Sequence, residues 1–286
     1  MKHFKLVAHF IFLLSSVSVS VNIAAQTPSK DNSKTQKIIA LTPHLVEMLY
    51  AIGAGDRIKG TVEYADYPES AKSIPRIGSY TGVQLEQIIA IDPDLIVASR
   101  GTNKEDDLRK LESLGYTMFY TEPKDISDIS KDLLRLGDAT DLQNNAKQLV
   151  EKLDKRYHKI VTRYQSSKPV KVFYQLWHDP LRTLGPKSWI SSMIRDCNGR
   201  NIFNESDSDY PVVSMESVVM KNPDVIIIPH HSGSALGKQE IWDKWPEIHA
   251  VQHNRLFVIH GDILHRFTPR ALDGLEQLCE AINSAR

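Results

Sequence analysis

The sequence predicts an α/β fold of two lobes, each with a mainly parallel sheet, joined by one long helix. Short strands rich in β-branched residues alternate with short amphipathic helices along the chain. A motif in the first half, Leu85–Val97 (LEQIIAIDPDLIV), returns in the second half as Met215–Ile227 (MESVVMKNPDVII). One uninterrupted helical pattern lies between the two copies. We therefore expect a lobe at 26–138, a connecting helix at 139–168 and a second lobe at 169–286.

The N-terminus is typical of a secretory signal peptide over residues 1–25. Lys2 and Lys5 precede an apolar stretch that ends in small residues before Gln26. The stretch is too short and too rich in serine for a spanning helix. No cysteine follows it, so a lipid anchor is not expected. We predict a soluble, exported protein that does not insert into the membrane.

The first lobe is predicted to begin with a strand at Lys37–Leu41. Thr42 suits the N-cap of the next helix, with Pro43 at its first position and Glu47 about one turn later. This helix should end near Ile52, because Gly53 supplies a C-terminal stop. The remaining expected strands are Arg57–Val62, Leu95–Ala98 and Thr117–Tyr120, and the remaining expected helices are Gln84–Ile91, Lys104–Leu114 and Ile126–Leu136.

The connecting helix is the clearest in the chain. Neither Gly nor Pro occurs from Ala139 to Lys168, and Gly137 and Pro169 bracket the segment. Apolar residues follow one another at intervals of three and four from Leu142 to Tyr164, as on one face of a helix. A stiff helix between lobes permits less closure than flexible crossovers, so we do not expect large hinge bending.

The second lobe again alternates short strands and helices. Its expected strands are Val170–Leu176, Val225–Ile228 and Leu256–Ile259, and its expected helices are Ser188–Cys197, Ser214–Met220, Gln239–Trp245 and Pro269–Ile282.

The repeated motif places one acid in each lobe. Glu86 and Glu216 each stand seven residues before a Pro-Asp pair, at the start of a short helix. Two equivalent carboxylates favour a binding protein that docks on a two-fold partner over an enzyme. The alternative is that each is simply a solvated helix residue.

The net charge and the two cysteines further restrict the classes of protein that fit this sequence. After removal of residues 1–25, 33 Lys and Arg face 35 Asp and Glu, a net charge of −2 without a basic stripe, so nucleic acid is not an expected partner. Cys197 and Cys279 are the only cysteines. In an oxidising compartment such a pair is expected to form a disulfide within the second lobe, the alternative being two buried thiols.

Several stretches of this chain resemble the helix-backboned class of periplasmic substrate-binding proteins that serve ABC importers of metal chelates. Within that class the similarity is greatest to the members that bind cobalamin. The resemblance covers the whole mature chain and is most specific at Glu63–Pro68, Ile77–Glu86, Asp92–Asn103, Cys197–Phe203 and Thr268–Cys279.

The resemblance implies which residues contact the ligand. Cobalamin is a large, rigid molecule with an apolar macrocycle rimmed by amides, so flat rings and polar side chains suit it. The candidate ligand-binding residues are Tyr64, Tyr80, Arg100, Trp177, Tyr210, Asp262 and Arg266. Tyr80 and Tyr210 stand where a relative has Trp, and Ser99 and Arg182 replace aromatic residues. Each candidate has a plainer alternative: the rings could pack within their own lobe, Asp262 and Arg266 could pair locally, and Arg100 could cap a helix.

The resemblance also implies a partner for the two acids. Glu86 and Glu216 would engage the inner-membrane permease dimer from opposite lobes, with the binding protein acting as a monomer. Cobalamin would be the transported ligand and not a resident cofactor, and no metal site or catalytic residue is expected.

Four other functions compete with this interpretation. A ferric siderophore or haem could be the ligand within the same superfamily. A zinc or manganese site is suggested by 11 His, although His249 and His253, spaced four apart, are expected in a loop that does not align them. An enzyme is disfavoured, because neither a nucleophile elbow nor a phosphate-binding loop occurs, and an adhesive module would lack a cleft.

Overall fold

The computed structural model describes residues 37–79, 81–165, 168–231 and 239–286. The expected signal peptide and Tyr80 therefore lie outside the described residues. Within the described residues, no helix is long and apolar enough to cross a membrane.

The first lobe is built on a four-stranded parallel sheet in the order β2-β1-β5-β6. Its strands are β1 (Ile38–Ala40), β2 (Ile58–Thr61), β5 (Leu95–Ser99) and β6 (Met118–Thr121). Its helices are α1 (Pro43–Ile52), α2 (Leu85–Ile91), α3 (Glu105–Ser113) and α4 (Ser127–Ala139). Short turns η1 (Gly55–Arg57) and η2 (Glu69–Ser73) and the small pair β3 (Gly78–Ser79) and β4 (Gly82–Val83) complete it. Because successive strands are parallel, their carboxyl ends meet at one edge.

The second lobe repeats this sheet in the order β10-β7-β11-β12, again parallel throughout. Its strands are β7 (Val170–Tyr174), β10 (Gly199–Asn201), β11 (Val225–His230) and β12 (Leu256–His260). A small hairpin, β8 (Trp177–His178) and β9 (Leu181–Arg182), follows β7. Its helices are α6 (Trp189–Asp196), α7 (Met215–Lys221), α8 (His249–Gln252), α9 (Gly261–His265) and α10 (Ala271–Asn283). The predicted α/β class with parallel sheets is confirmed.

The sequence repeat corresponds to a structural repeat. The backbone N–H of Lys37, just before β1, donates to the Asp94 carboxylate at 2.8 Å. In the second lobe the N–H of Lys171, at the start of β7, donates to Asp224 at the same distance. Each preceding helix is followed by a C-cap residue in the left-handed conformation, Asp92 after α2 and Asn222 after α7. The repeated Pro-Asp thus ties the third strand along the chain to the first strand of each lobe.

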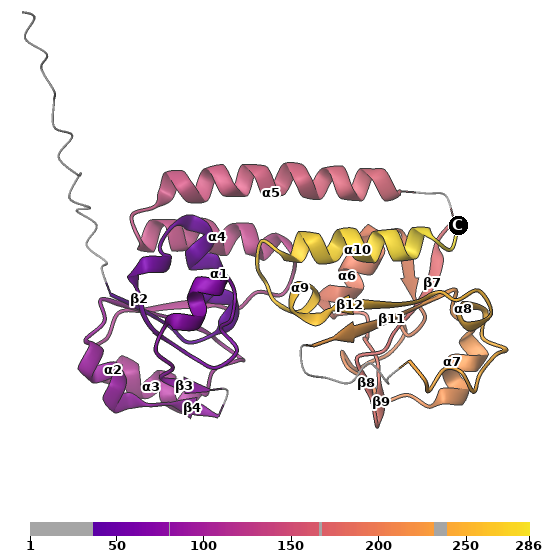
Figure 1. The fold of residues 1–286 in the computed structure, drawn as a ribbon, viewed down its shortest axis with the longest axis horizontal. Helices are drawn as coiled ribbons and strands as arrows, with labels where there is room; N and C mark the ends of the chain where they lie inside the picture. Colours follow the sequence, from indigo (N-terminus) through magenta and orange to yellow (C-terminus); the bar gives the residue numbers. More distant parts are fainter. Residues whose placement is uncertain (1–36, 80, 166–167, 232–238) are drawn as a thin grey trace, which may run out of the picture. The chain divides into compact units, whose positions relative to one another are not determined.

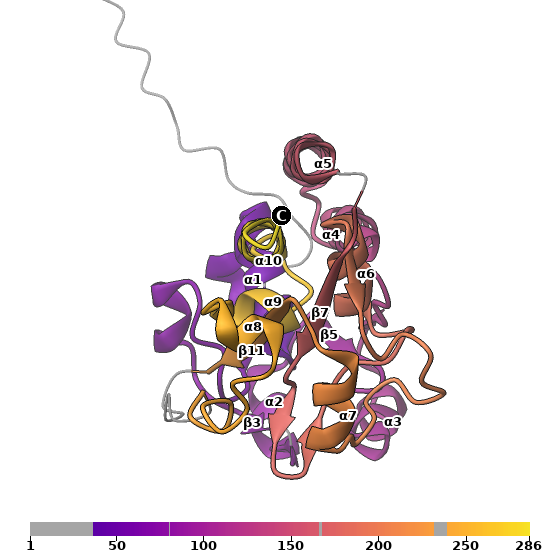
Figure 2. The ribbon, with the colours of Figure 1, turned by 90° about the vertical axis from the view of Figure 1, so that its right-hand side faces the viewer.

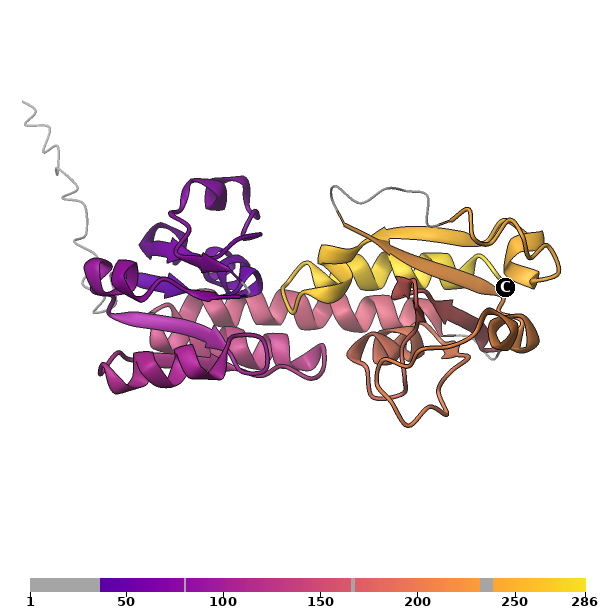
Figure 3. The same cartoon turned by 90° about the horizontal axis from the view of Figure 1, so that it is seen from below.

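The connecting helix is α5 (Gln143–Tyr164), which packs on α4 and α1 and also on α10 of the second lobe (Figure 1). Figure 2 shows α5 end-on above α4 and α10, and Figure 3 shows it running beside α10. One buried apolar cluster contains side chains from both sheets together with Ala146, Val150 and Ile160 of this helix. The apolar stripe of α5 therefore supports the helix-facing side of both sheets.

Cys197 and Cys279 form the predicted disulfide, with an S–S distance of 1.99 Å and a Cα–Cα distance of 4.7 Å. Cys197 is the C-cap of α6 and Cys279 lies in α10, and both are fully buried. The bridge joins two elements of one lobe that are 82 residues apart in sequence.

Three local predictions were wrong. Residues 239–245 form turns and not a helix, with the buried Trp242 indole donating to Gln175 Oε1 at 2.6 Å. Residues 261–265, between the expected strand Leu256–Ile259 and the expected helix Pro269–Ile282, form the helix α9, and α8 begins at His249 in a segment expected to be a loop. Thr42 is the N-cap of α1 as expected, but its hydroxyl makes no capping bond.

Candidate functional site

The candidate site lies where the parallel strands end. Two hollows share the side chain of His265, one of about 380 Å³ and one of about 360 Å³. The first is lined by Leu176, Trp177, Pro180, Arg182, Pro229, His231 and His265. The second is lined by Thr42, Pro43, His44, Ser99, Arg100, Gly101, Thr102, Glu122, Pro123, His265, Arg266 and Phe267. We call the two together the strand-end cleft. Ligands of α/β proteins bind at such edges.

Trp177 and Arg182 form one end of the strand-end cleft. They face each other across the β8–β9 hairpin, and Trp177 is 49% exposed. Its indole N–H donates to the carbonyl of Asp179 at 2.9 Å, which fixes the ring close to the hairpin turn. Arg182 Nη1 donates to the carbonyl of Tyr210 at 3.2 Å, so the two residues lie together. A half-exposed indole beside a guanidinium presents a flat surface with a polar edge.

Arg100 marks the other end of the cleft, directly after β5. Its guanidinium pairs with Glu105 at 2.7 Å and lies 4.1 Å from the centre of the Tyr120 ring. Asn103, by contrast, is used within the lobe, because its side chain accepts from the N–H of Ser99 and donates to the carbonyl of Leu41. Arg100 lines the cleft but is already held by a carboxylate.

Between these ends lies an ionic network centred on Arg266. Its guanidinium contacts Asp262 at 3.0 Å, Asp66 at 3.2 Å and the carbonyl of Tyr64 at 3.2 Å. The local pairing of Asp262 with Arg266 that the sequence left open is therefore present, but Arg266 also reaches the first lobe. Tyr64 follows β2, is 69% exposed and has a φ of +64°, and its backbone carbonyl accepts the bond from Arg266.

The partner that sequence reasoning missed is Glu47 of α1. Its side chain is only 2% exposed. It accepts from Arg266 Nη1 at 2.9 Å, from Arg270 Nη2 at 2.7 Å and from Arg270 Nε at 2.8 Å. Arg270 also lies 3.7 Å above the Tyr67 ring. The sequence analysis treated Glu47 as a helix-starting acid, whereas the structure uses it to bind two arginines of the second lobe.

Histidines also gather at the strand ends. His265 Nε2 lies 2.7 Å from the hydroxyl of Tyr174, and its ring centre lies 5.3 Å from that of His231. Burial, reinforced by the charge of His231, lowers the pKa of His265 to about 4. Burial and the charge of Arg266 lower the pKa of His44 to about 4. Hydrogen bonding from His231, with the charge of Arg266, holds the pKa of Asp262 below its ordinary value.

The histidines do not converge on a metal in the described residues, where no group of three or more His, Cys, Asp or Glu side chains has suitable geometry. His249 and His253 lie closer than expected, with ring centres 4.2 Å apart, because α8 begins at His249. His249 Nδ1 lies 3.1 Å from Asp224, the acid of the second repeat. This pair is therefore joined to the second-lobe repeat and lies outside the strand-end cleft lining.

The lowered pKa values of His44 and His265 are expected to make the stability of the protein depend on pH. Each has a folded-state pKa near 4 against an ordinary value of 6.5, so between these values the unfolded chain binds protons that the folded chain does not. Stability should fall as the pH falls from 7 to 5, by about 2 kcal/mol for each histidine. Urea unfolding at the two pH values measures this loss, and His265→Gln should reduce it. If His265→Gln lost as much unfolding free energy between pH 7 and pH 5 as the original protein, His265 would not be a source of the pH dependence.

Glu86 and Glu216 occupy equivalent places on exposed helices. Each side chain is solvent-exposed at the second position of its helix, α2 or α7. The backbone N–H of Glu216 itself, aided by Ser214, lowers the pKa of that carboxyl. Neither residue lines the strand-end cleft.

Comparison with known proteins agrees with this geometry. A family model described as periplasmic binding protein matches residues 38–263. The chain belongs to the periplasmic binding protein family. The periplasmic location predicted from the sequence agrees with this membership.

Individual relatives are more specific. The chain is 34% identical over 252 residues to the vitamin B12-binding protein of Vibrio cholerae serotype O1, covering 88% of this chain and 90% of that protein. The crystal structure of the periplasmic vitamin B12 binding protein BtuF of Vibrio cholerae matches with a TM-score of 0.79 and 34% identity, covering 88% of this chain and 98% of that one. The periplasmic heme binding protein HutB of Vibrio cholerae matches at 19% identity with a TM-score of 0.74, covering 86% of this chain and 98% of that one, and shares the fold.

Proposed function

We propose that this periplasmic protein captures cobalamin in the strand-end cleft and delivers it to an inner-membrane ABC permease. The observation that carries the proposal is the similarity to vitamin B12-binding proteins over about nine-tenths of both chains. A haem-binding protein of the same fold is far less similar in sequence. The protein acts as a binding protein and not as an enzyme.

The chemistry of the cleft supports a corrinoid. The ligand offers apolar faces and an amide rim, so it needs flat apolar surfaces with hydrogen-bonding groups at their edges. Trp177 supplies an exposed indole at one end, and Arg100 and Arg182 supply donors for amide carbonyls. Because cobalamin carries its own axial base, it needs no metal ligand from the protein.

Each remaining candidate has a proposed role. Tyr64 and Tyr210 present exposed rings near the cleft margin, beside Arg266 and Arg182 respectively. Tyr80 is proposed to contact the ligand on the resemblance alone. Asp262 and Arg266 form an ion pair at 3.0 Å; the Asp262 carboxylate can accept further bonds from amide N–H groups of the rim, and the Arg266 side chain, which lines the cleft, lies against the rim.

A spectroscopic titration tests the capture step. Cyanocobalamin should bind one-to-one with its cobalt absorption spectrum unchanged, because no axial ligand is displaced. Trp177→Ala should weaken binding by roughly 5- to 30-fold, the value of about 1–2 kcal/mol for a lost aromatic contact. Leu114→Ala, which removes another exposed apolar side chain, should leave affinity unchanged. If Trp177→Ala and Leu114→Ala weakened cyanocobalamin binding equally, Trp177 would not contact the ligand.

Docking is proposed to use Glu86 and Glu216. Two carboxylates fixed on equivalent helices can orient the protein on a two-fold partner that presents cations, although each exposed pair is individually weak. The two acids lie outside the cleft lining, so docking and capture use different side chains.

Replacing both acids should separate the two steps. Glu86→Ala with Glu216→Ala should leave cyanocobalamin affinity within about twofold of the original while uptake into cells falls at least about tenfold. Lys at both positions should be worse, because like charges would then meet. Alanine at the exposed Glu151 and Glu240 is the matched control and should leave uptake intact. If the double-Ala variant lost cyanocobalamin binding but still docked on the permease, Glu86 and Glu216 would belong to the ligand-binding surface and not to the docking surface.

A further inference from the structure

The arginines that line the strand-end cleft differ in how their charge is compensated. Arg100 pairs with Glu105 at 2.7 Å, and Arg266 pairs with Glu47 at 2.9 Å and with two further acids. Arg182 lines the half of the cleft that the second lobe forms. Among the residues that the structure describes, no carboxylate lies within 4.0 Å of its guanidinium. Arg182 therefore differs from the other two in having no acid to neutralise it within that part of the chain.

The surroundings of Arg182 are also poor in compensating charge. The hollow of about 380 Å³ beside it has no Asp or Glu among its described lining residues. The acids of the adjoining turns, Asp179 and Asp209, lie more than 4.0 Å from the guanidinium. Asp262, an acid of the neighbouring network, is already paired with Arg266 at 3.0 Å. The electrostatic potential in this half of the cleft therefore favours an anionic group on the ligand.

The backbone holds Arg182 in a defined position. Trp177 lies directly opposite it in the β8–β9 pair, and the Arg182 carbonyl accepts from the N–H of Leu176 at 2.9 Å. On its other side Arg182 forms a bridge with Val212. Its Nη1 donates to the carbonyl of Tyr210 at 3.2 Å, and the guanidinium keeps its other N–H donors. The charged group is therefore oriented within the hairpin and retains donors for a ligand.

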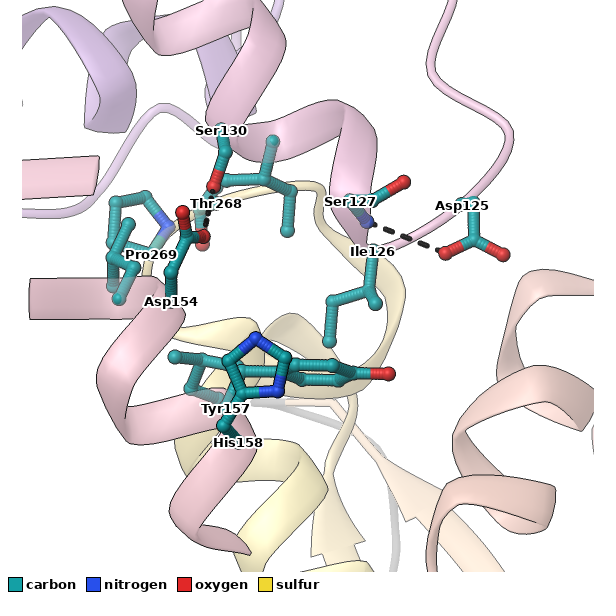
Figure 4. Close-up of a pocket in the computed structure, with 12 residues that line it drawn as sticks. Asp125, Ile126, Ser127, Ser130, Asp154, Tyr157, His158, Thr268 and Pro269 are labelled. Atoms are coloured by element: carbon teal, nitrogen blue, oxygen red, sulfur yellow. Dashed lines mark hydrogen bonds between the residues drawn. The ribbon is translucent and has the colours of Figure 1, made fainter. Parts of the chain in front are cut away.

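A hollow outside the strand-end cleft does not suit an anionic group. It measures about 300 Å³ and lies between α4, α5 and the segment that leads into α10, and Figure 4 shows Asp125 and Asp154 at opposite sides of it. No Lys or Arg belongs to its lining residues in the described part of the chain. An anion there would meet repulsion from both carboxylates. The cleft half around Arg182 is therefore the better place for an anion.

Cobalamin has a peripheral anionic group, the phosphodiester of its nucleotide tail, which is attached to one of the rim amides. Guanidinium and phosphate form pairs of parallel, charge-assisted hydrogen bonds. We propose that Arg182 binds this phosphate, so that the cleft prefers a complete cobalamin to a corrinoid that lacks the nucleotide tail. The phosphate contact rests on the proposed function, because it requires cobalamin in the strand-end cleft.

Calorimetric titration of the whole protein with cyanocobalamin and with dicyanocobinamide tests this contact. Dicyanocobinamide has the same macrocycle and rim amides but lacks the nucleotide tail and its phosphate. Arg182→Gln should weaken cyanocobalamin binding at least about tenfold, because charge-assisted bonds are lost, and should leave the affinity for dicyanocobinamide within about twofold. Arg200→Gln, at an exposed arginine of the same lobe outside the cleft lining, should leave both affinities unchanged.

Salt dependence and a conservative variant give independent readouts. Raising the KCl concentration from about 50 mM to about 500 mM should weaken cyanocobalamin binding by the original protein, and much less by Arg182→Gln. Arg182→Lys retains the charge and should lose less affinity for cyanocobalamin than Arg182→Gln. The side chain is exposed, so both variants should keep the far-UV circular dichroism of the original.

Two results would overturn the phosphate contact alone. One is equal weakening of cyanocobalamin and dicyanocobinamide by Arg182→Gln, and the other is an unchanged cyanocobalamin affinity in that variant. Failure of the original protein to bind cyanocobalamin would instead overturn the proposed function, and the phosphate contact with it.

Discussion

Glu47→Ala is expected to lower the free energy of unfolding by about 3–5 kcal/mol. The carboxylate is nearly fully buried and accepts three bonds from Arg266 and Arg270. Its removal leaves two largely buried guanidiniums without their main acceptor, and breaking one partner of a buried ion pair costs this much. Arg266 keeps Asp66 and Asp262, so the lower half of the range is the better expectation.

Urea denaturation of four proteins measures the effect: the original, Glu47→Ala, Arg270→Ala and the double variant. The double variant should be less destabilised than the sum of the two single changes, because the second removal no longer leaves a buried charge unpaired. Glu151→Ala, an exposed acid on α5, should change stability by less than about 0.5 kcal/mol. Strict additivity would show that Glu47 and Arg270 do not interact.

Removing the disulfide should have a similarly large effect. The bridge closes a span of 82 residues, for which the chain-entropy model gives a stabilisation of about 4 kcal/mol. Replacing both Cys197 and Cys279 with Ala should lower the unfolding free energy by an amount of this order, since both positions are buried and lose a covalent contact between α6 and α10.

Thiol labelling provides the control for this prediction. The exported protein, unfolded without a reductant, should show no reactive thiol, and reduction should reveal two. Reduction of the double-Ala variant should leave its stability unchanged. Two labelled thiols before reduction would contradict the bridge.

Local patterns predicted much of the fold because strands and helices here follow their sequence periodicity closely. The helix from Pro43 to Ile52 has the predicted ends, set by proline at its first position and Gly53 in the left-handed conformation at its end. The repeat also predicted equivalent elements in the two lobes. In each lobe the Asp of the Pro-Asp pair accepts a hydrogen bond from a backbone N–H at the start of the first strand. Residues 239–245 were predicted less well, because burial of Trp242 stabilises turns there despite a helix-like composition.

The site was harder to predict because its contacts join residues far apart in the sequence. The bond from Arg266 to Glu47 spans 219 residues, and no local pattern distinguishes that glutamate from a helix-starting acid. His265 was similarly hidden, since its role depends on burial beside Tyr174. By contrast, Trp177 and Arg100 could be proposed from the family resemblance, and the structure places Arg100 directly after β5 and Trp177 in the hairpin that follows β7.

The central claim is that the strand-end cleft takes a corrinoid. Calorimetric titration of the purified protein with cyanocobalamin, haem and a ferric siderophore, each under the same conditions, tests it most directly. The account predicts saturable one-to-one binding of cyanocobalamin that neither of the other ligands displaces. Strong binding of haem or the siderophore with no heat from cyanocobalamin would contradict it.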